Sequence, residues 1–280
     1  MIKTPNFIFL GPDKAGSTWI HRILNDHSEC FVPQKVKETF FFNRYYQRGF
    51  KWYLSFFEEC PSEVHTIGEV CHDYLFSRPA AERIKNYIPE VKLLTCLRNP
   101  AERSFSQYLY LVRSGITRKP FSQALREIPR LIDNSLYYKH LSYYFDLFEP
   151  SQIKVLYFDN LKADPPLFAR ELFSFLDVDY SQHIDYLRQA LPASRPRSFL
   201  LARLAKIGAN FARRLSLEEI VGHIKTSNLI DFLYLPYKTS EKPEMGREIR
   251  HELIQIFLKD IQKLEQLLNK DFSHWVVVDE

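Results

Sequence analysis

The segment that most constrains the fold is a glycine-bounded loop that follows an apolar run near the N-terminus. Residues 7–10 read Phe-Ile-Phe-Leu, and the pattern Gly-x-x-x-x-Gly-Ser-Thr then runs from Gly11 to Thr18. A buried strand, a glycine-rich turn and a helix N-terminus together form a cradle of backbone N–H groups that can bind a phosphate. The sequence therefore predicts a strand–loop–helix unit of an α/β fold with an anion site at its turn.

The position of the lysine distinguishes this loop from the loop of a nucleotide triphosphatase. In those enzymes a lysine follows the second glycine and reaches the β- and γ-phosphates. Here Ser17 occupies that place, and the lysine of the loop is Lys14. The loop is thus suited to a nucleotide with a compact anionic 5′ end. A small-molecule kinase is the alternative, and it would need a carboxylate-held Mg²⁺ in addition to the missing lysine.

Composition excludes several other classes of protein. The 280 residues include 45% hydrophobic and 26% charged residues, as in an ordinary globular protein, and we expect one domain over residues 1–280. The formal net charge of +4 suits an anionic ligand but is too small for wholesale nucleic-acid binding. Four scattered cysteines predict buried thiols in a reducing compartment, and no secretory or membrane-spanning segment is recognisable, so we expect a cytoplasmic protein.

Strand-like and helix-like segments alternate along the chain. Runs at residues 65–70, 91–97 and 153–158 resemble the first strand, and each is followed by turn residues and a helical pattern. This alternation predicts a P-loop-like three-layer α/β fold, in which helices flank a central parallel sheet. The expected helices cover residues 17–27, 100–115, 135–148, 165–176 and 244–268.

Two of these helices carry further expectations. Ser17 and Thr18 are expected to cap the first helix with their side chains. The last helix is amphipathic, and its apolar stripe is expected to comprise Ile249, Leu253, Ile256, Leu264 and Leu267.

A second anion signal follows the strand at residues 91–97. Arg98 ends that strand, and Ser106 lies two turns into the next helix. Ligands of open α/β sheets bind at the carboxyl ends of strands, where a guanidinium can grip a phosphate in two places. An ordinary helix start with a surface ion pair is the alternative for this segment alone. Together, the two signals describe a ligand with two separated phosphates, such as 3′-phosphoadenosine 5′-phosphosulfate (PAPS), the sulfuryl donor.

A third signal lies between the first two strands. Residues 35–43 read Lys-Val-Lys-Glu-Thr-Phe-Phe-Phe-Asn, and residues 49–53 read Gly-Phe-Lys-Trp-Tyr. With these segments the chain resembles the PAPS-dependent carbohydrate sulfotransferases, which include the heparan sulfate sulfotransferases, and among them the soluble bacterial type. The resemblance extends to residues 67–70, 98–106, 135–137 and 153–164, and it covers roughly residues 6–180.

The resemblance implies a role for each matching residue. Lys14 would bridge the donor sulfate and the leaving phosphate, and residues 15–19 (Ala15, Gly16, Ser17, Thr18 and Trp19) would hold the 5′-phosphate. Arg98 and Ser106 would hold the 3′-phosphate. Glu38 matches the proposed general base, which must take the proton of the attacking group. A solvated carboxylate paired with a neighbouring lysine is the alternative for Glu38. No metal is required.

The acceptor side departs from the family pattern. Golgi relatives place Lys after Glu near residue 70, where this chain has Val70-Cys71-His72, so a sulfated glycan acceptor is in doubt. His72 is the second candidate for the base, with a pocket-wall residue as the alternative. We expect the acceptor to contact Lys37, Phe40, Phe41, His72 and Tyr74.

A basic stretch follows the family's matching region. Residues 186–217 contain seven arginine or lysine residues and no acidic residue. One interpretation is a helical flap over the site, formed by about residues 186–240. In such a flap, Arg195 or Arg197 would contact the 3′-phosphate. A solvated helix face and a membrane-surface helix are the others.

The sequence as a whole predicts a sulfotransferase that works by in-line displacement. The acceptor would be a hydroxyl, or as second choice an amine, of a small-molecule natural product or carbohydrate. A non-catalytic module that binds anionic ligands or membranes is the alternative from another class. We expect no nucleic-acid partner and no stable membrane insertion, and a homodimer is left open.

Overall fold

A computed structural model describes residues 3–188, 194–214, 221, 232–238, 241 and 243–277. The chain divides into two compact units. The first comprises Met1–Arg98 and Tyr137–Ala190, and the second comprises Asn99–Leu136 and Leu191–Glu280. The expected organisation as one domain stays a prediction.

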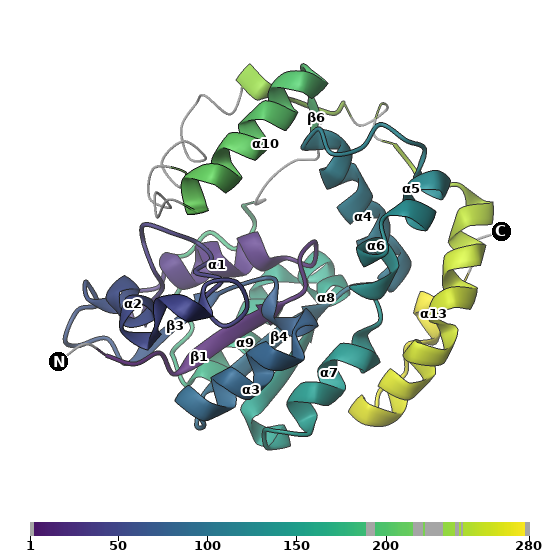
Figure 1. Cartoon of the computed structure of the whole chain (residues 1–280). Helices are drawn as coiled ribbons and strands as arrows, with labels where there is room; N and C mark the ends of the chain where they lie inside the picture. Colours follow the sequence, from purple (N-terminus) through teal and green to yellow (C-terminus); the bar gives the residue numbers. More distant parts are fainter. Residues whose placement is uncertain are drawn as a thin grey trace. The chain divides into compact units, whose positions relative to one another are not determined.

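The first unit is built on a five-stranded parallel sheet in the order β2-β3-β1-β4-β5 (Figure 1). The central strand β1 pairs with β3 on one side and with β4 on the other, and Phe7 lies opposite Gly68. A Cβ at Gly68 would lie 2.1 Å from the Phe7 carbonyl oxygen, so only glycine permits this close approach. The strands are β1 (Phe7–Gly11), β2 (Cys30–Phe31), β3 (Thr66–Val70), β4 (Lys92–Leu97) and β5 (Ile153–Tyr157).

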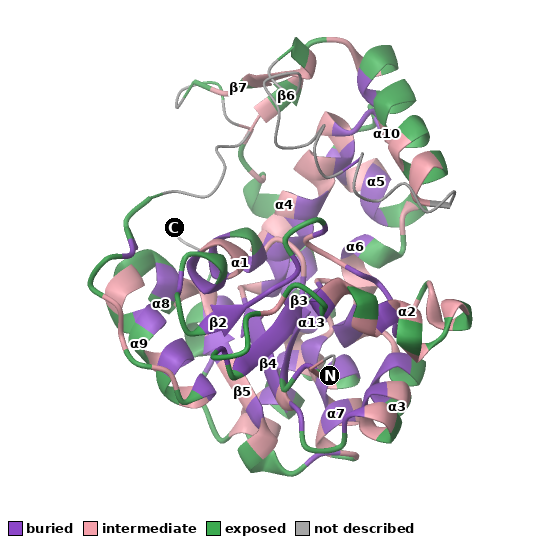
Figure 2. Ribbon diagram, turned by 90° about the vertical axis from the view of Figure 1, so that its left-hand side faces the viewer, coloured by how far each residue is buried: buried purple, intermediate pink, exposed green. Residues whose placement is uncertain are grey.

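Helices cover both faces of this sheet, as the alternating pattern predicts. On one face α1 (Ser17–Asn25), α8 (Phe158–Ala163) and α9 (Pro165–Leu176) pack against the side chains of β1, β4 and β5. On the other face lie α3 (Arg78–Tyr87) and α7 (Tyr137–Phe145) (Figure 2). Buried strands with apolar residues on both faces require such a double cover. The predicted three-layer parallel fold is therefore confirmed.

Short helices complete the first unit around the loops. They are η1 (Tyr46–Arg48), α2 (Phe50–Leu54), η2 (Ser55–Phe57), η3 (Tyr74–Phe76) and η4 (Pro150–Gln152).

The second unit is mainly helical, with a small antiparallel pair of strands. Its buried Arg103 donates hydrogen bonds to Ser135 Oγ at 2.7 Å and to the Leu131 carbonyl at 3.2 Å. An ion pair between Arg250 and Glu102 joins α13 to α4. The elements are α4 (Pro100–Arg113), α5 (Phe121–Glu127), α6 (Arg130–Asp133), β6 (Ser194–Pro196), α10 (Phe199–Arg214), β7 (Tyr234–Pro236), α13 (Arg247–Leu268) and η6 (Ser273–Trp275).

Two predictions about helix ends and faces are wrong. The residue that precedes α1 is Gly16 in the left-handed conformation, so Ser17 and Thr18 lie inside the helix and do not cap it. The helix predicted at residues 244–268 begins at Arg247, and Ile256 of its expected stripe is 40% exposed. Leu253 and Leu264 of the expected stripe are buried as predicted, and the rest of the buried face comprises Ile254, Phe257 and Ile261.

Other predictions are met in part. The helix expected at residues 135–148 covers only Tyr137–Phe145. Strands β2, β6 and β7 have two or three residues each and are too short for a periodic signal. Cys30, Cys71 and Cys96 are buried thiols, whereas Cys60 is half-buried. Much of the predicted flap, including residues 189–193 and 215–220, lies outside the described residues.

Candidate active site

The loop between β1 and α1 depends on two glycines with positive φ. Gly11 has φ +118° and Gly16 has φ +88°. A Cβ at Gly11 would lie 2.5 Å from the His72 carbonyl oxygen, and one at Gly16 would lie 2.8 Å from the Leu161 side chain. Thr95 Oγ1 donates a 2.7 Å hydrogen bond to the Gly11 carbonyl. The loop therefore passes close to the segment after β3, and a larger residue at either glycine would displace it.

The first turn of α1 offers an anion site at the end of this loop. In the described part of the chain no side chain accepts a cap hydrogen bond at this helix start, and its first turn contains no acidic residue. The first N–H groups of a helix have no intrahelical partner, and the helix dipole adds partial positive charge there. A phosphate or sulfate is the kind of group that satisfies such a site.

Arg98 reaches the same loop from the end of β4. Its Nη1 donates a 3.1 Å hydrogen bond to the Lys14 carbonyl, and its guanidinium lies 4.9 Å from the centre of the Phe158 ring. Tyr137 Oη donates a 2.7 Å hydrogen bond to the Arg98 carbonyl. The structure thus brings together Arg98 and Lys14, two of the predicted donor-binding residues.

The other predicted donor-binding residues belong to the second unit. Ser106 is half-buried on α4. Arg195 in β6 forms a 3.6 Å ion pair with Glu241, and the Arg197 backbone donates to the Leu233 carbonyl. Their contact with the donor stays a prediction.

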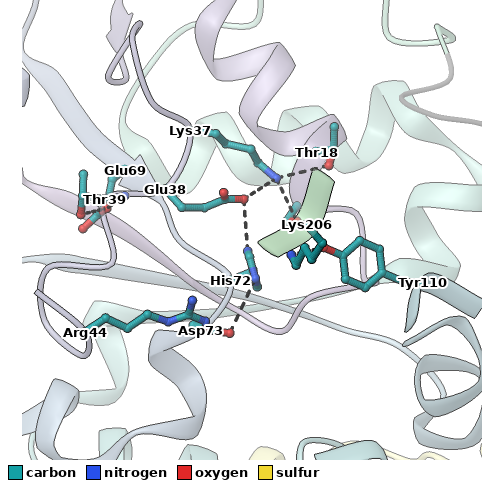
Figure 3. A network of polar contacts seen from close by, with 11 residues as sticks. Thr18, Lys37, Glu38, Thr39, Arg44, Glu69, His72, Asp73, Tyr110 and Lys206 are labelled. Atoms are coloured by element: carbon teal, nitrogen blue, oxygen red, sulfur yellow. Dashed lines mark hydrogen bonds and ion pairs between the residues drawn. The ribbon is translucent and has the colours of Figure 1, made fainter. Parts of the chain in front are cut away.

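Lys37 links the start of α1 to the candidate base (Figure 3). Its Nζ lies 3.4 Å from Ser17 Oγ, 3.2 Å from Thr18 Oγ1 and 3.3 Å from Glu38 Oε1. The sequence predicts Lys37 as an acceptor contact. That contact stays a prediction, and the structure places the Lys37 ammonium group beside the predicted anion site.

The two candidate bases, Glu38 and His72, form one hydrogen-bonded pair. His72 Nδ1 lies 3.1 Å from Glu38 Oε1, and the side chains are 25% and 13% exposed, respectively. Because a carboxylate only accepts, the hydrogen of this bond belongs to Nδ1. His72 Nε2 is 3.6 Å from Asp73 Oδ1, which is too long for a hydrogen bond. Asp73 in turn pairs with Arg44.

Phe40 forms an apolar wall beside this pair. Its ring meets the His72 ring edge-on at 5.5 Å, and the Arg44 guanidinium lies 4.2 Å from its centre. Phe40 has a positive φ of 52°, which is uncommon for a bulky residue. The segment that carries Glu38 is therefore held by its surroundings in a conformation that the chain would not favour by itself.

A buried carboxyl lies beneath Glu38. Glu69 in β3 is fully buried, and its side chain accepts hydrogen bonds from Thr39 Oγ1 at 2.7 Å and from Tyr74 Oη at 3.0 Å. Burial raises the pKa of Glu69 from 4.5 to about 7, against the opposing effect of these hydrogen bonds. Since Thr39 follows Glu38 in the chain, this contact fixes the backbone next to the candidate base.

Four of the predicted site residues have buried side chains. Phe41 and Tyr74 are fully buried, since Phe41 stacks on Tyr53 at 4.9 Å and the Tyr74 hydroxyl bonds Glu69. Both side chains pack inside the first unit, and their direct contact with the acceptor stays a prediction. Trp19 lies in the core, and its indole N–H donates to the Tyr186 carbonyl. Ala15 is also fully buried.

Several residues of this network are not predicted from the sequence. Glu69 could have been found from the sequence, because an acidic residue within an otherwise apolar strand indicates a buried carboxyl group with a specific role. Arg44, Asp73 and Thr39 carry none, because their partners lie far along the chain. His21 on α1 also belongs here, since burial and the nearby Lys37 ammonium lower its pKa to about 4.

Comparison with known proteins identifies the class. Residues 4–210 match the sulfotransferase domain, and the chain therefore belongs to the sulfotransferase family. The predicted sulfotransferase family is confirmed. Within the described residues, no group of three or more His, Cys, Asp or Glu side chains is arranged to hold a metal ion.

Individual relatives differ in how much of the chain they match. The human bifunctional heparan sulfate N-deacetylase/N-sulfotransferase 3 is 29% identical over 66% of this chain, which spans only 24% of that protein's length. The membrane-associated sulfotransferase kil1 of Dictyostelium discoideum is 23% identical over 96% of the chain and 66% of its own length. The crystal structure of a sulfotransferase from Alicyclobacillus acidocaldarius superposes with a TM-score of 0.71 at 24% identity, over 98% of this chain and 99% of that chain.

Proposed function

We propose that this protein transfers the sulfuryl group of PAPS to a hydroxyl group of a small-molecule natural product or carbohydrate. An amine is the second choice of acceptor group. The contact of Lys37 with both the first turn of α1 and Glu38 carries this proposal, because it joins an anion site to a carboxylate. Such adjacency is what in-line transfer between a bound donor and a deprotonated acceptor requires.

The donor would lie with its 5′ end at the start of α1. The backbone N–H groups of Gly16, Ser17 and Thr18 bind the 5′-phosphate, while Lys14 and Lys37 neutralise the sulfate and the charge that develops on the leaving phosphate. Arg98 holds the 3′-phosphate. Its guanidinium has five N–H donors, and one of them, on Nη1, bonds the Lys14 carbonyl and braces the loop.

Glu38 would act as the general base. The acceptor oxygen attacks sulfur, its proton passes to a Glu38 carboxylate oxygen, and the bond from sulfur to the phosphate oxygen breaks. The electron pair of that bond leaves on 3′-phosphoadenosine 5′-phosphate (PAP). The Nδ1–H of His72 orients Glu38, and Phe40 forms an apolar wall for the acceptor. His72 is the competing candidate for the base through its Nε2.

Calorimetric titration with PAP tests the donor assignment. We expect PAP to bind more tightly than AMP or ATP, and we expect Arg98→Ala to remove this preference for PAP. A preference for ATP with Mg²⁺ would instead support the small-molecule kinase.

Cytoplasmic location and a homodimer stay predictions. Within the described residues, no helix combines the length and the apolar character needed to cross a bilayer.

A further inference from the structure

Helix α10 of the second unit presents a stripe of large apolar side chains to solvent. Leu200, Leu204, Ile207 and Phe211 are between 55% and 62% exposed. Their spacings of four, three and four residues place them on one line along the helix. Leu201, which is 55% exposed, widens this line at its beginning. We call these five residues the α10 stripe.

The opposite face of α10 is attached to the second unit. Ala202 is fully buried, and Lys206 Nζ donates a 2.9 Å hydrogen bond to Tyr110 Oη on α4. A Cβ at Gly115 would lie 2.6 Å from the Phe199 carbonyl, so the start of α10 is closely packed. The stripe is therefore the outward face of an anchored helix. Single exposed apolar residues need no explanation, whereas a contiguous set marks an interaction surface.

The charges around the stripe define what it can bind. Arg203 is exposed on the flank of the helix, and Arg197 is exposed just before its start. The Arg118 guanidinium lies 4.1 Å from the Phe199 ring. No acidic residue occurs in residues 186–217. The occupant must accept apolar side chains in its interior and carry negative charge at its surface.

An anionic lipid surface has both properties in one plane. A helix with an apolar face and basic flanks lies in the interface, with the apolar side chains among the acyl chains and the basic groups at the headgroups. A second copy of this chain fits less well, because pairing two such faces would bring like charges together. We propose that α10 is an interfacial helix that attaches this protein reversibly to anionic membranes. This attachment does not depend on the sulfuryl-transfer reaction.

Co-sedimentation of the full chain with lipid vesicles tests this proposal. The vesicles contain phosphatidylcholine alone or with about one third phosphatidylglycerol. We expect binding to the anionic vesicles only, and we expect it to weaken as salt is raised. The double variant Leu204→Glu with Phe211→Glu should bind at least about tenfold less, since it places charge on the apolar face.

A matched control variant separates the loss of vesicle binding caused by charge on the α10 stripe from the effect of a charge added at any exposed apolar position. Leu167 on α9 is 53% exposed, so Leu167→Glu adds a charge at a comparable apolar position outside α10. This variant should bind vesicles as the wild type does. Circular dichroism and thermal unfolding verify that each variant folds. A folded double variant that still binds would overturn the proposal, as would a wild type that ignores anionic vesicles. Light scattering provides the third test, because a wild-type dimer that the double variant loses would assign the stripe to a second copy.

Discussion

The hydroxyl group of Thr39 donates a 2.7 Å hydrogen bond to the buried carboxyl group of Glu69. This bond joins a core strand to the residue that follows the proposed base Glu38. The Thr39 backbone N–H, 3.4 Å from the same carboxyl oxygen, adds a second link. The backbone next to Glu38 is thus fixed from the interior of the sheet.

Removing the Thr39 hydroxyl should therefore lower turnover without removing the donor site. We expect Thr39→Val to reduce kcat and to cost about 1–3 kcal/mol of stability, because a buried acceptor loses the shorter of its two hydrogen bonds from Thr39. Thr39→Ser retains the hydroxyl and should retain most of the activity. Steady-state kinetics and PAP titration measure the two effects. Equal kcat for the Val and Ser variants would contradict a role for this hydrogen bond.

The free energy of unfolding should depend on pH because Glu69 titrates differently in the folded and unfolded states. Its folded pKa of about 7 lies above the ordinary 4.5, so between these values the folded state binds the proton that the unfolded state has released. This contribution is fully present below pH 4.5 and is lost as the pH rises through about 7. Glu69→Gln removes the titration, so its stability relative to the wild type should increase from pH 5 to pH 8, by up to roughly 3 kcal/mol.

Urea unfolding of wild type and Glu69→Gln at several pH values measures this difference. Glu63, which is exposed, offers the control variant Glu63→Gln. Its stability relative to the wild type should not rise over the same pH interval. A difference between Glu69→Gln and wild type that stays constant from pH 5 to pH 8 would show that Glu69 titrates in its ordinary range.

The pair Glu38 and His72 can be separated by variants that keep the hydrogen bond. Glu38→Gln removes the basic oxygen, and we expect turnover to fall by about 10²-fold or more with PAP binding intact. His72→Asn retains an N–H that can donate in place of Nδ1 but has no basic nitrogen. We expect this variant to keep most of the turnover. The opposite ranking of the two variants would make His72 the base.

Lys37 should contribute to turnover through its charge. Because its ammonium lies 3.2 Å from Thr18 Oγ1, we expect Lys37→Met to slow turnover by about 10²-fold. Lys35 is a control two residues away, since it pairs with Glu59 at 3.0 Å and both side chains are half-exposed. Lys35→Met should change neither turnover nor PAP binding by more than a factor of about two. A Lys37→Met enzyme as active as Lys35→Met would exclude the charge of Lys37 from catalysis.

The sequence alone determined the elements of this protein whose signals are local. The apolar run before Gly11, the strands at residues 91–97 and 153–158 and the helix at Pro165–Leu176 are all found where the pattern predicts them. Periodicity and backbone freedom act over a few residues, so they can be read without a fold. The family resemblance rests on the same short segments.

The tertiary structure decided which side chains meet. Glu38 and His72 are 34 residues apart, and they pair because the parallel pairing of β2 with β3 brings the segments that follow these strands to the same edge of the sheet. The same fold buries the aromatic side chains of Phe41 and Tyr74, whereas Lys37 is only half-buried. Burial and hydrogen-bond satisfaction are properties of the whole packed unit, and no local pattern specifies whether an aromatic ring faces a ligand or the core.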